Sequence, residues 1–227
     1  QTLQSEKRLK RFPKYFYDLI IVDEAHHCLS KSYQNIFSYF DQALVLGVTA
    51  TPDRGDKKNL GQFFESVAFE YLLPTAIKEG FLSKITALTL PLEIKLGKLS
   101  TQAGDYKVGE LDSVLTPYLT AIADEMVIHC ANRKTIVFLP LIATSQKMTE
   151  ILNMKGFRAA EINGNSKDRK EILKGFDKNQ YNVICNSMLL TEGFDQPDVD
   201  CVICLRPTKI RSLYCQIIGR GTRLSPG

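Results

Sequence analysis

The sequence has 227 residues, 44% of them hydrophobic, and a formal net charge of +4. That length allows one large or two modest hydrophobic cores. The apolar runs are short and interrupted by polar residues, which excludes a membrane span of roughly 20 residues, and the basic N-terminal stretch has no apolar signal-peptide core. We therefore expect a cytoplasmic protein with no membrane partner.

The positive charge is unevenly distributed along the chain. Residues 201–227 contain several lysine and arginine side chains and no acidic one. Such an asymmetry is typical of a protein with a polyanion partner, although a solvated basic face is an equally common cause.

The first part of the chain is predicted to alternate strands and helices. Apolar runs at 17–22 and 44–48 indicate strands, and the second ends at Thr49-Ala50-Thr51-Pro52 because proline ends a strand. The other expected elements, in chain order, are a helix at 32–40, a helix at 60–64, a strand at 66–71, a helix with a glycine stop at 74–80 and an extended segment at 85–96. Residues 97–110 are polar and glycine-rich, which indicates a linker or mobile hairpin.

After Pro117 the alternation of strands and helices becomes regular, which indicates a lobe with a mainly parallel sheet. The expected strands are 135–139, 158–162, 182–186 and 201–205. The expected helices are 118–130, 145–155, 166–174 and 210–219. We therefore predict an α/β protein with two lobes, residues 1–96 and 117–227, joined by a linker at 97–116.

The acidic motif Asp23-Glu24-Ala25-His26 directly follows the first predicted strand, which would carry it to the edge where open α/β sheets bind ligands. Asp23 would hold magnesium through water and Glu24 would polarise an attacking water, because phosphoryl transfer depends on positioning and charge neutralisation. The alternative is an acidic helix N-cap. Thr49 and Thr51 follow the neighbouring strand, where their hydroxyls could bond to His26 or Glu24; a turn before proline explains them equally well.

A second motif, Gln216-Ile217-Ile218-Gly219-Arg220-Gly221-Thr222-Arg223, closes the chain. It places two guanidinium groups three residues apart on a predicted helix turn, where they could face a triphosphate, since arginine stays charged and pairs bidentately with phosphate oxygens. The alternative is a basic helix end favoured by the helix dipole. Upstream, Gly193 permits close backbone approach and Asp195 could bind a ribose hydroxyl, or the two form a turn with a capping acid.

The pair Cys201 and Cys204 has the spacing of a zinc knuckle or redox motif. A zinc site requires a second such pair, and residues three apart on a predicted strand point to opposite faces. We therefore interpret the six cysteines as core residues of a reducing compartment.

The sequence lacks the phosphate-binding loop Gly-x-x-x-x-Gly-Lys-Ser/Thr that such a nucleotide site requires. The nearest segment, Gly97-Lys98-Leu99-Ser100, has neither the first glycine nor a hydroxyl after the lysine. A strand carrying the acidic pair normally follows that loop, and the chain opens with Gln1. We therefore expect a fragment whose first lobe is truncated at its N-terminus, and we predict that it hydrolyses little or no ATP by itself.

These ordered motifs resemble those of superfamily 2 helicases of the DEAH-box type, which have two RecA-like lobes. The similarity extends from the acidic motif through Thr49-Ala50-Thr51-Pro52, Ile136-Val137-Phe138 and Thr191-Glu192-Gly193-Phe194-Asp195 to the closing arginine motif. The segments Ala76-Ile77-Lys78-Glu79-Gly80-Phe81-Leu82 and Arg206-Pro207-Thr208 resemble the bacterial and phage branch related to restriction-enzyme translocases and DNA-repair helicases.

The resemblance implies a role for each residue of the two motifs. Asp23 and Glu24 would handle magnesium and water, and His26 with Thr49 and Thr51 would couple hydrolysis to motion. Gly193 and Asp195 would help hold the nucleotide, while Arg220 and Arg223 would sense the γ-phosphate with support from Gln216. Nucleic-acid backbone would be contacted near Phe138, Leu139, Asn163, Gly164 and Thr191, with steep salt dependence and no sequence readout.

The leading hypothesis is an ATP-dependent helicase or translocase that uses ATP and Mg²⁺, with DNA favoured over RNA by the subfamily resemblance. One alternative is a non-catalytic nucleic-acid-binding scaffold that kept the fold without the phosphate loop. Another is the motor part of a restriction-type complex, whose nuclease centre would lie elsewhere. The sequence does not identify which protein partners, if any, the chain binds.

Overall fold

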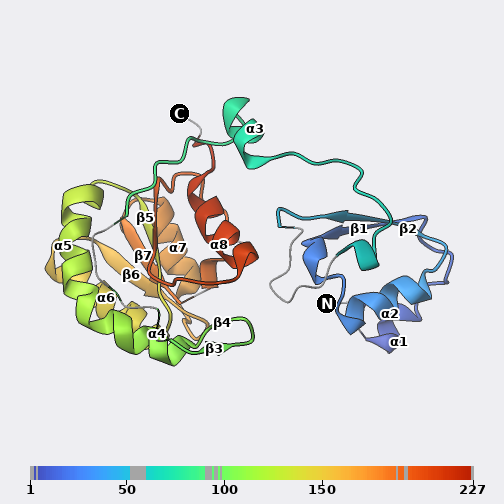
Figure 1. Ribbon diagram of the computed structural model, residues 1–227, viewed down its shortest axis with the longest axis horizontal. Coiled ribbons are helices and arrows are strands. Elements are labelled where there is room, and N and C mark those ends of the chain that lie inside the picture. The colour runs from blue at the N-terminus through green and yellow to red at the C-terminus, as the bar shows by residue number, and fades with distance from the viewer. Residues whose placement is uncertain are drawn as a thin grey trace. The chain divides into compact units, whose positions relative to one another are not determined.

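The computed structural model describes residues 3, 5–51, 60–89, 94, 97, 99–187, 189–191 and 194–225. The chain forms two compact units, residues 1–70 and 71–227 (Figure 1). Helices and parallel strands in both units confirm the predicted α/β class. In the described part of the chain, no helix combines the length and the apolar character that crossing a membrane requires.

The first unit is built on a two-stranded parallel sheet. Strands β1 (Leu19–Asp23) and β2 (Leu44–Val48) pair so that Asp23 lies opposite Val48. The helical elements of this unit are α1 (Glu6–Leu9), η2 (Ala25–His27), α2 (Lys31–Tyr39) and η3 (Leu60–Gln62). One sheet face packs into a small core with Ala25 and Phe37. The other face is apolar and exposed, and consists of Leu19, Ile21, Leu44, Leu46 and Val48.

The second unit contains a four-stranded parallel sheet with strand order β6-β7-β5-β8. Its strands are β5 (Thr135–Phe138), β6 (Ala159–Ile162), β7 (Val183–Asn186) and β8 (Cys201–Cys204). Four helices accompany the strands: α5 (Leu119–Cys130), α6 (Ile142–Met154), α7 (Arg169–Asp177) and α8 (Arg211–Ile218). β5 and β7 are buried along their whole length, as expected for parallel strands with helices on both faces.

Side chains alternate along β5 between two hydrophobic cores, following the two-residue period of a strand. Val137 packs with residues of α5 and α6, and Ile136 and Phe138 pack with residues of α7 and α8. Helices α5 and α6 therefore cover one face of the sheet, and α7 and α8 cover the other (Figure 1). This sandwich holds the carboxyl ends of all four strands at one edge.

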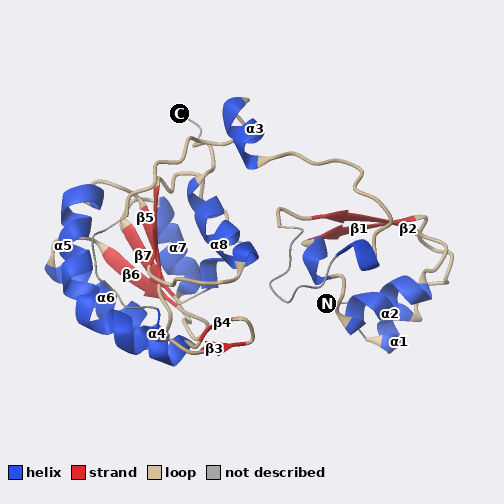
Figure 2. Ribbon diagram, viewed as in Figure 1, coloured by secondary structure: helices blue, strands red, loops and turns tan. Residues whose placement is uncertain are grey.

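Shorter elements complete the second unit (Figure 2). They are α3 (Leu73–Lys78), the hairpin strands β3 (Thr101–Gln102) and β4 (Asp105–Tyr106), α4 (Val108–Leu115), and the 3-10 turns η5 (Thr116–Tyr118), η6 (Leu189–Thr191) and η7 (Gly219–Gly221). The glycine stop expected after α3 is present, because Gly80 has a φ of 80° that other residues rarely adopt.

Two sequence-based expectations were wrong. The strand expected at 66–71 is not formed, and Val67 and Phe69 are exposed without a described strand beside them. The segment interpreted as a linker or mobile hairpin contains the hairpin but is followed by the helix α4, whose Leu111 and Leu115 are buried. Most of the extended segment expected at 85–96 lies outside the described residues beyond position 89.

Candidate functional site

One candidate cluster, in the first unit, lies at the carboxyl edge of the β1–β2 sheet. Asp23 is the last residue of β1 and Glu24 follows it, and Thr49 and Thr51 follow β2, so the parallel register brings both pairs to one edge. His26 is 6% exposed and its Nδ1 lies 3.1 Å from Thr49 Oγ1 and 3.2 Å from Glu24 Oε2. Thr49 Oγ1 also accepts the Thr51 N–H at 3.1 Å. A contiguous polar chain thus connects the ends of two adjacent strands.

Glu24 has an unusual backbone conformation. Its φ of 52° and ψ of 49° are left-handed, which costs a residue with a Cβ roughly 1–2 kcal/mol. The Glu24 N–H donates to Asp23 Oδ1 at 2.8 Å, and η2 starts immediately afterwards. Such strain persists where the surroundings hold it and concentrates at functional sites.

The donor set at this edge fits magnesium. Mg²⁺ is bound in proteins through one or two carboxylates, several waters and substrate phosphates. Asp23 is exposed, and the Glu24 side chain is 43% exposed. Two accessible carboxylates therefore suit a water-rich ion shared with a nucleotide better than a closed structural site. Among the described residues, no cluster of three or more metal-binding side chains occurs.

A separate candidate cluster, in the second unit, lies at the end of α8. Arg220 Nη1 donates to the Phe194 carbonyl oxygen, and Arg223 Nη1 forms an ion pair with the Asp195 carboxylate. Gln216 precedes them on α8 and is half-buried. The structure therefore brings both predicted arginines to the segment that carries Asp195. Gly193 lies outside the described residues, so its predicted role stays a prediction.

Gly221 explains part of the closing motif. A Cβ at this position would lie 2.9 Å from Val202 Cγ2 on β8, closer than side chains pack. Because glycine lacks this atom, η7 can lie directly against the sheet. The two arginines on either side of Gly221 are thereby held at a fixed distance from β8.

The residues predicted to touch nucleic acid differ in accessibility. Phe138 and Leu139 are fully buried, so their side chains cannot reach a strand of nucleic acid. Asn163 is also buried and shapes its own loop, since its Nδ2 donates to Glu161 Oε2 and its Oδ1 accepts the Asn165 N–H. Gly164 borders open space. The side chain of Thr191 lies outside the described part of the chain.

Five of the six cysteines pack in or against the cores, but the prediction was wrong for Cys215, which is exposed on α8. Cys201 packs with the core under α5 and α6, whereas Cys204 packs with the core under α7 and α8, so the two point to opposite faces of β8. Cys201 Sγ instead lies 3.7 Å from Cys130 Sγ. A hydrogen bond from Cys130 lowers the pKa of Cys201 to about 7. All six cysteines are free thiols.

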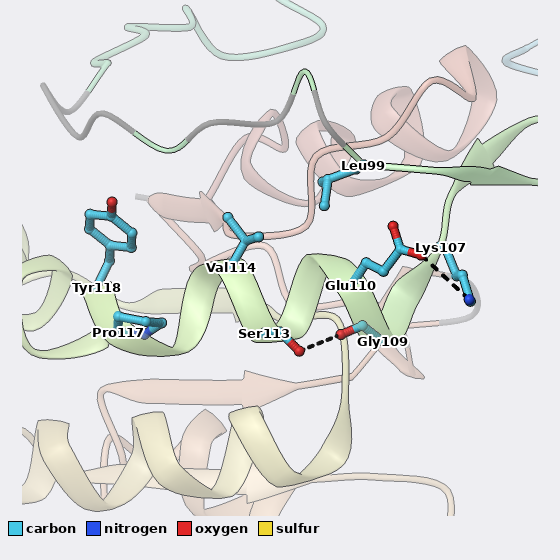
Figure 3. Close-up of a pocket in the computed structure, with 8 residues that line it drawn as sticks. All are labelled: Leu99, Lys107, Gly109, Glu110, Ser113, Val114, Pro117 and Tyr118. Atoms are coloured by element: carbon cyan, nitrogen blue, oxygen red, sulfur yellow. Dashed lines mark hydrogen bonds and ion pairs between the residues drawn. The ribbon is translucent and has the colours of Figure 1, made fainter.

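A shallow cavity of about 880 Å³ lies along α4 and is lined by none of the predicted site residues (Figure 3). Apolar side chains line one part of it, and an ion pair between Lys107 and Glu110 lines another. Close to it, Asp105 is a buried acid that the sequence did not single out. Its carboxylate contacts the turn before α8. The sequence feature next to Asp105 that indicates a turn is the preceding residue, Gly104.

The chain matches two families of known proteins. Residues 119–225 match the helicase conserved C-terminal domain, and residues 1–54 match the type III restriction enzyme res subunit. The ATP-dependent helicase IRC3 of Saccharomyces cerevisiae is 28% identical over 96% of this chain and 34% of its own length. The DNA 3'-5' translocase XPB2 of Sulfurisphaera tokodaii is 24% identical over 96% of this chain and 57% of its own length.

A solved structure shares the fold. The HsdR subunit fragment of a type I restriction enzyme from Vibrio vulnificus YJ016 superposes with a TM-score of 0.76 and 28% identity, covering 98% of this chain and 44% of that one. The two units therefore have the architecture of RecA-like lobes. With the Asp-Glu-Ala-His motif at its strand end, the chain is similar to helicases and restriction-enzyme motor subunits in both units. It spans about a third to a little over half of these relatives' lengths.

Proposed function

We propose that this chain is the part of an ATP-driven nucleic-acid helicase or translocase that contains its acidic and arginine motifs. The observation that carries the proposal is the polar chain from Glu24 through His26 to Thr49, at the carboxyl edge of two parallel strands. Ligands of open α/β sheets bind at that edge. A buried histidine bonded to the neighbouring strand is suited to transmit the state of a bound nucleotide.

Each side chain has a role that its position allows. Asp23 and Glu24 hold and orient water through exposed carboxylates, and bound Mg²⁺ supplies charge neutralisation for the phosphate oxygens. Arg220 and Arg223 supply positive charge from the end of α8. The Asp195 carboxylate pairs with the Arg223 guanidinium in this structure. When a nucleotide binds, Asp195 contacts a ribose hydroxyl instead, and the Arg223 guanidinium is then free to contact phosphate. Gln216 supports the same segment one turn earlier.

We further propose DNA as the preferred track. The relative XPB2 is named a DNA translocase, and the matching solved structure comes from a restriction enzyme. The exposed Lys209 and Arg211 supply charge for the phosphate backbone. The predicted domain limits, 1–96 and 117–227 with a linker at 97–116, and the cytoplasmic location belong to the same proposal.

The experiment is ATP hydrolysis by the full-length protein with single-stranded and double-stranded DNA and RNA. An Arg220→Ala variant is compared with Arg133→Ala, a control at a surface arginine whose side chain is 53% exposed and lies 3.7 Å from Asp200. We expect stimulation by DNA, its loss in Arg220→Ala and its retention in Arg133→Ala. Loss of one arginine that stabilises transferring phosphate lowers kcat by about 10³-fold or more.

Two outcomes would contradict the proposal. The absence of hydrolysis under every condition favours the nucleic-acid-binding scaffold, and stimulation by RNA alone contradicts the choice of track. The 227 residues are tested beside the full-length protein. We expect little or no turnover from them, because the lysine and backbone amides of a phosphate loop are not in this sequence. Magnesium-dependent turnover by these residues would overturn that expectation.

A further inference from the structure

The hairpin β3–β4 is closed at both ends. Its turn residues Ala103 and Gly104 have φ of 52° and 85°, the positive values of a two-residue hairpin turn. At its base, Lys107 N–H donates to the Ser100 carbonyl at 3.0 Å. Glu110 on α4 accepts the Ser100 N–H at 2.8 Å and the Ser100 hydroxyl at 2.5 Å. The hairpin is therefore fixed to α4 and presents β4 in one orientation.

Asp105 on β4 is 7% exposed and accepts hydrogen bonds from a turn about a hundred residues away in sequence. Its Oδ1 accepts the Lys209 N–H at 2.9 Å, and its Oδ2 accepts the Thr208 hydroxyl at 2.9 Å. Arg206 Nη2 lies 3.5 Å from the same Oδ2. The Tyr106 N–H donates to Oδ1 from within the hairpin. A buried carboxylate requires such donors, so these contacts stabilise each other.

The turn that Asp105 holds is the start of α8. Thr208 Oγ1 accepts the Ile210 N–H at 3.0 Å while its hydroxyl donates to Asp105. Ile210 is the N-cap residue of α8 and makes no side-chain capping bond of its own. The first free amides of a helix need such an acceptor. Thr208, which is itself held by Asp105, therefore satisfies the N–H of the N-cap residue of α8.

A second contact joins the same two segments. Lys209 Nζ lies 4.8 Å from the centre of the Tyr106 ring, within the range of a cation–π interaction. The backbone of Lys209 is held by Asp105 and its side chain by the next residue of the hairpin. The hairpin and the 206–210 turn consequently behave as one body, with α8 extending from it.

We propose that Asp105 is a positioning residue for the arginine motif: through Thr208 and Lys209 it fixes where α8 begins, and so where Gln216, Arg220 and Arg223 lie. The expected effect of Asp105 on ATP hydrolysis rests on the proposed function. The claim that Asp105 fixes the start of α8 does not depend on that function. Asp105 touches none of the predicted nucleotide-binding residues in the described contacts and acts only through the turn.

The structural arm uses backbone amide exchange in the 227-residue chain. In Asp105→Ala we expect exchange of the Lys209 and Ile210 amides to accelerate about tenfold or more, the effect of losing a hydrogen bond to a charged group. Amides of β5 and β7 should be unchanged. Glu110→Gln loosens only the base of the hairpin and should give a smaller effect. Asp124→Asn, an exposed acid of α5 that pairs with Lys155, is the matched control.

The functional arm measures stimulated ATP hydrolysis by the full-length protein. Asp105→Ala should lower kcat about tenfold, and adding it to Arg220→Ala should cause less further loss than it does alone, because both act on the same arginines. Thr208→Val should reproduce the loss, and combined with Asp105→Ala it should add little. A residue that only stabilises the fold would instead give losses that add independently.

The outcomes separate the two proposals. Unchanged exchange at Lys209 and Ile210, or equal acceleration in β5 and β7, overturns the positioning role. Accelerated exchange with kcat within twofold of the wild type overturns its link to the arginines. If the wild-type protein hydrolyses no ATP, the proposed function fails, while the exchange experiment still decides whether Asp105 fixes α8.

Discussion

Two apolar runs that look alike in sequence have different surroundings in the two units. Leu19-Ile20-Ile21-Val22 forms β1, in which Ile21 is 63% exposed, whereas Ile136-Val137-Phe138-Leu139 forms β5 and its continuation, in which every side chain is fully buried. Parallel strands normally have both faces covered. A continuous apolar run therefore predicts a parallel strand. It does not reveal whether other described residues of the same unit cover both faces of the sheet that contains this strand.

The largest expected difference between the units is the loss of unfolding free energy when an apolar side chain is replaced by alanine. Leu152 on α6 is fully buried between α5 and the sheet, so Leu152→Ala should lower the free energy of unfolding of the second unit by about 2–5 kcal/mol. Leu44 on β2 is 74% exposed, and Leu44→Ala should change stability by at most about 0.5 kcal/mol. Urea denaturation of both variants checks this. Equal costs would mean that the exposed face of the first unit is covered in solution.

A smaller effect is expected where the first unit is closely packed. A Cβ on Gly47 would collide with the ring of Phe64 and lie 2.8 Å from Ala25 Cβ. Gly47→Ala should therefore destabilise the first unit by about 1–3 kcal/mol, seen as faster amide exchange in β1 and β2. Gly109→Ala on α4 is the control, because nothing lies within 4 Å of its added Cβ. Unchanged exchange in the Gly47 variant would show that Phe64 moves aside without cost.

The sequence predicted regular elements better than it predicted the contacts between them. Helix α5 and strand β7 followed directly from apolar periodicity. Helix α4 was missed because only two of its apolar residues, Leu111 and Leu115, are buried, and its glycine and acids suggested a loop. The expected strand at 66–71 had the right composition but no neighbouring described strand to pair with.

The candidate site shows the same limit. The acidic and arginine motifs were found because their residue types carry chemistry in short, ordered patterns. Asp105 was not found, because its partners Thr208 and Lys209 are distant in sequence and only the fold brings them together. The burial of Phe138 and Leu139 was equally hidden, since a strand end can expose or bury its last side chains.

A third effect, of about 1 kcal/mol, concerns the strained turn of the first unit. Glu24→Gly and Glu24→Ala both remove the carboxylate, but only glycine adopts the observed φ of 52° without steric cost. The glycine variant should thus be more stable than the alanine variant by roughly 1 kcal/mol. Both should abolish stimulated ATP hydrolysis in the full-length protein. Equal stability of the two variants would show that the turn relaxes when the side chain is removed.

The smallest effect is expected at two thiols, where reactivity should change but stability should not. Burial raises the pKa of Cys28 in the first unit to about 11, whereas the hydrogen bond from Cys130 lowers the pKa of Cys201 in the second to about 7. Because the thiolate is the nucleophile, a lowered pKa means that the reactive form is already present at neutral pH. Iodoacetamide labelling of Cys201 should therefore rise at a lower pH than labelling of an ordinary cysteine.

Peptide mapping by mass spectrometry distinguishes the thiols, and Cys130→Ser supplies the matched variant. A serine hydroxyl can still donate to the Cys201 thiolate, so the pH midpoint of Cys201 labelling should stay below the usual cysteine range, whereas Cys130→Ala should move it upward. Cys28 should remain unlabelled up to pH 9 in every variant, because it is fully buried as well as protonated. If Cys28 were labelled as fast as Cys201, the first unit would have to open readily in solution. The difference between the two units would then lie in the stability of their cores and not in the reactivity of their thiols.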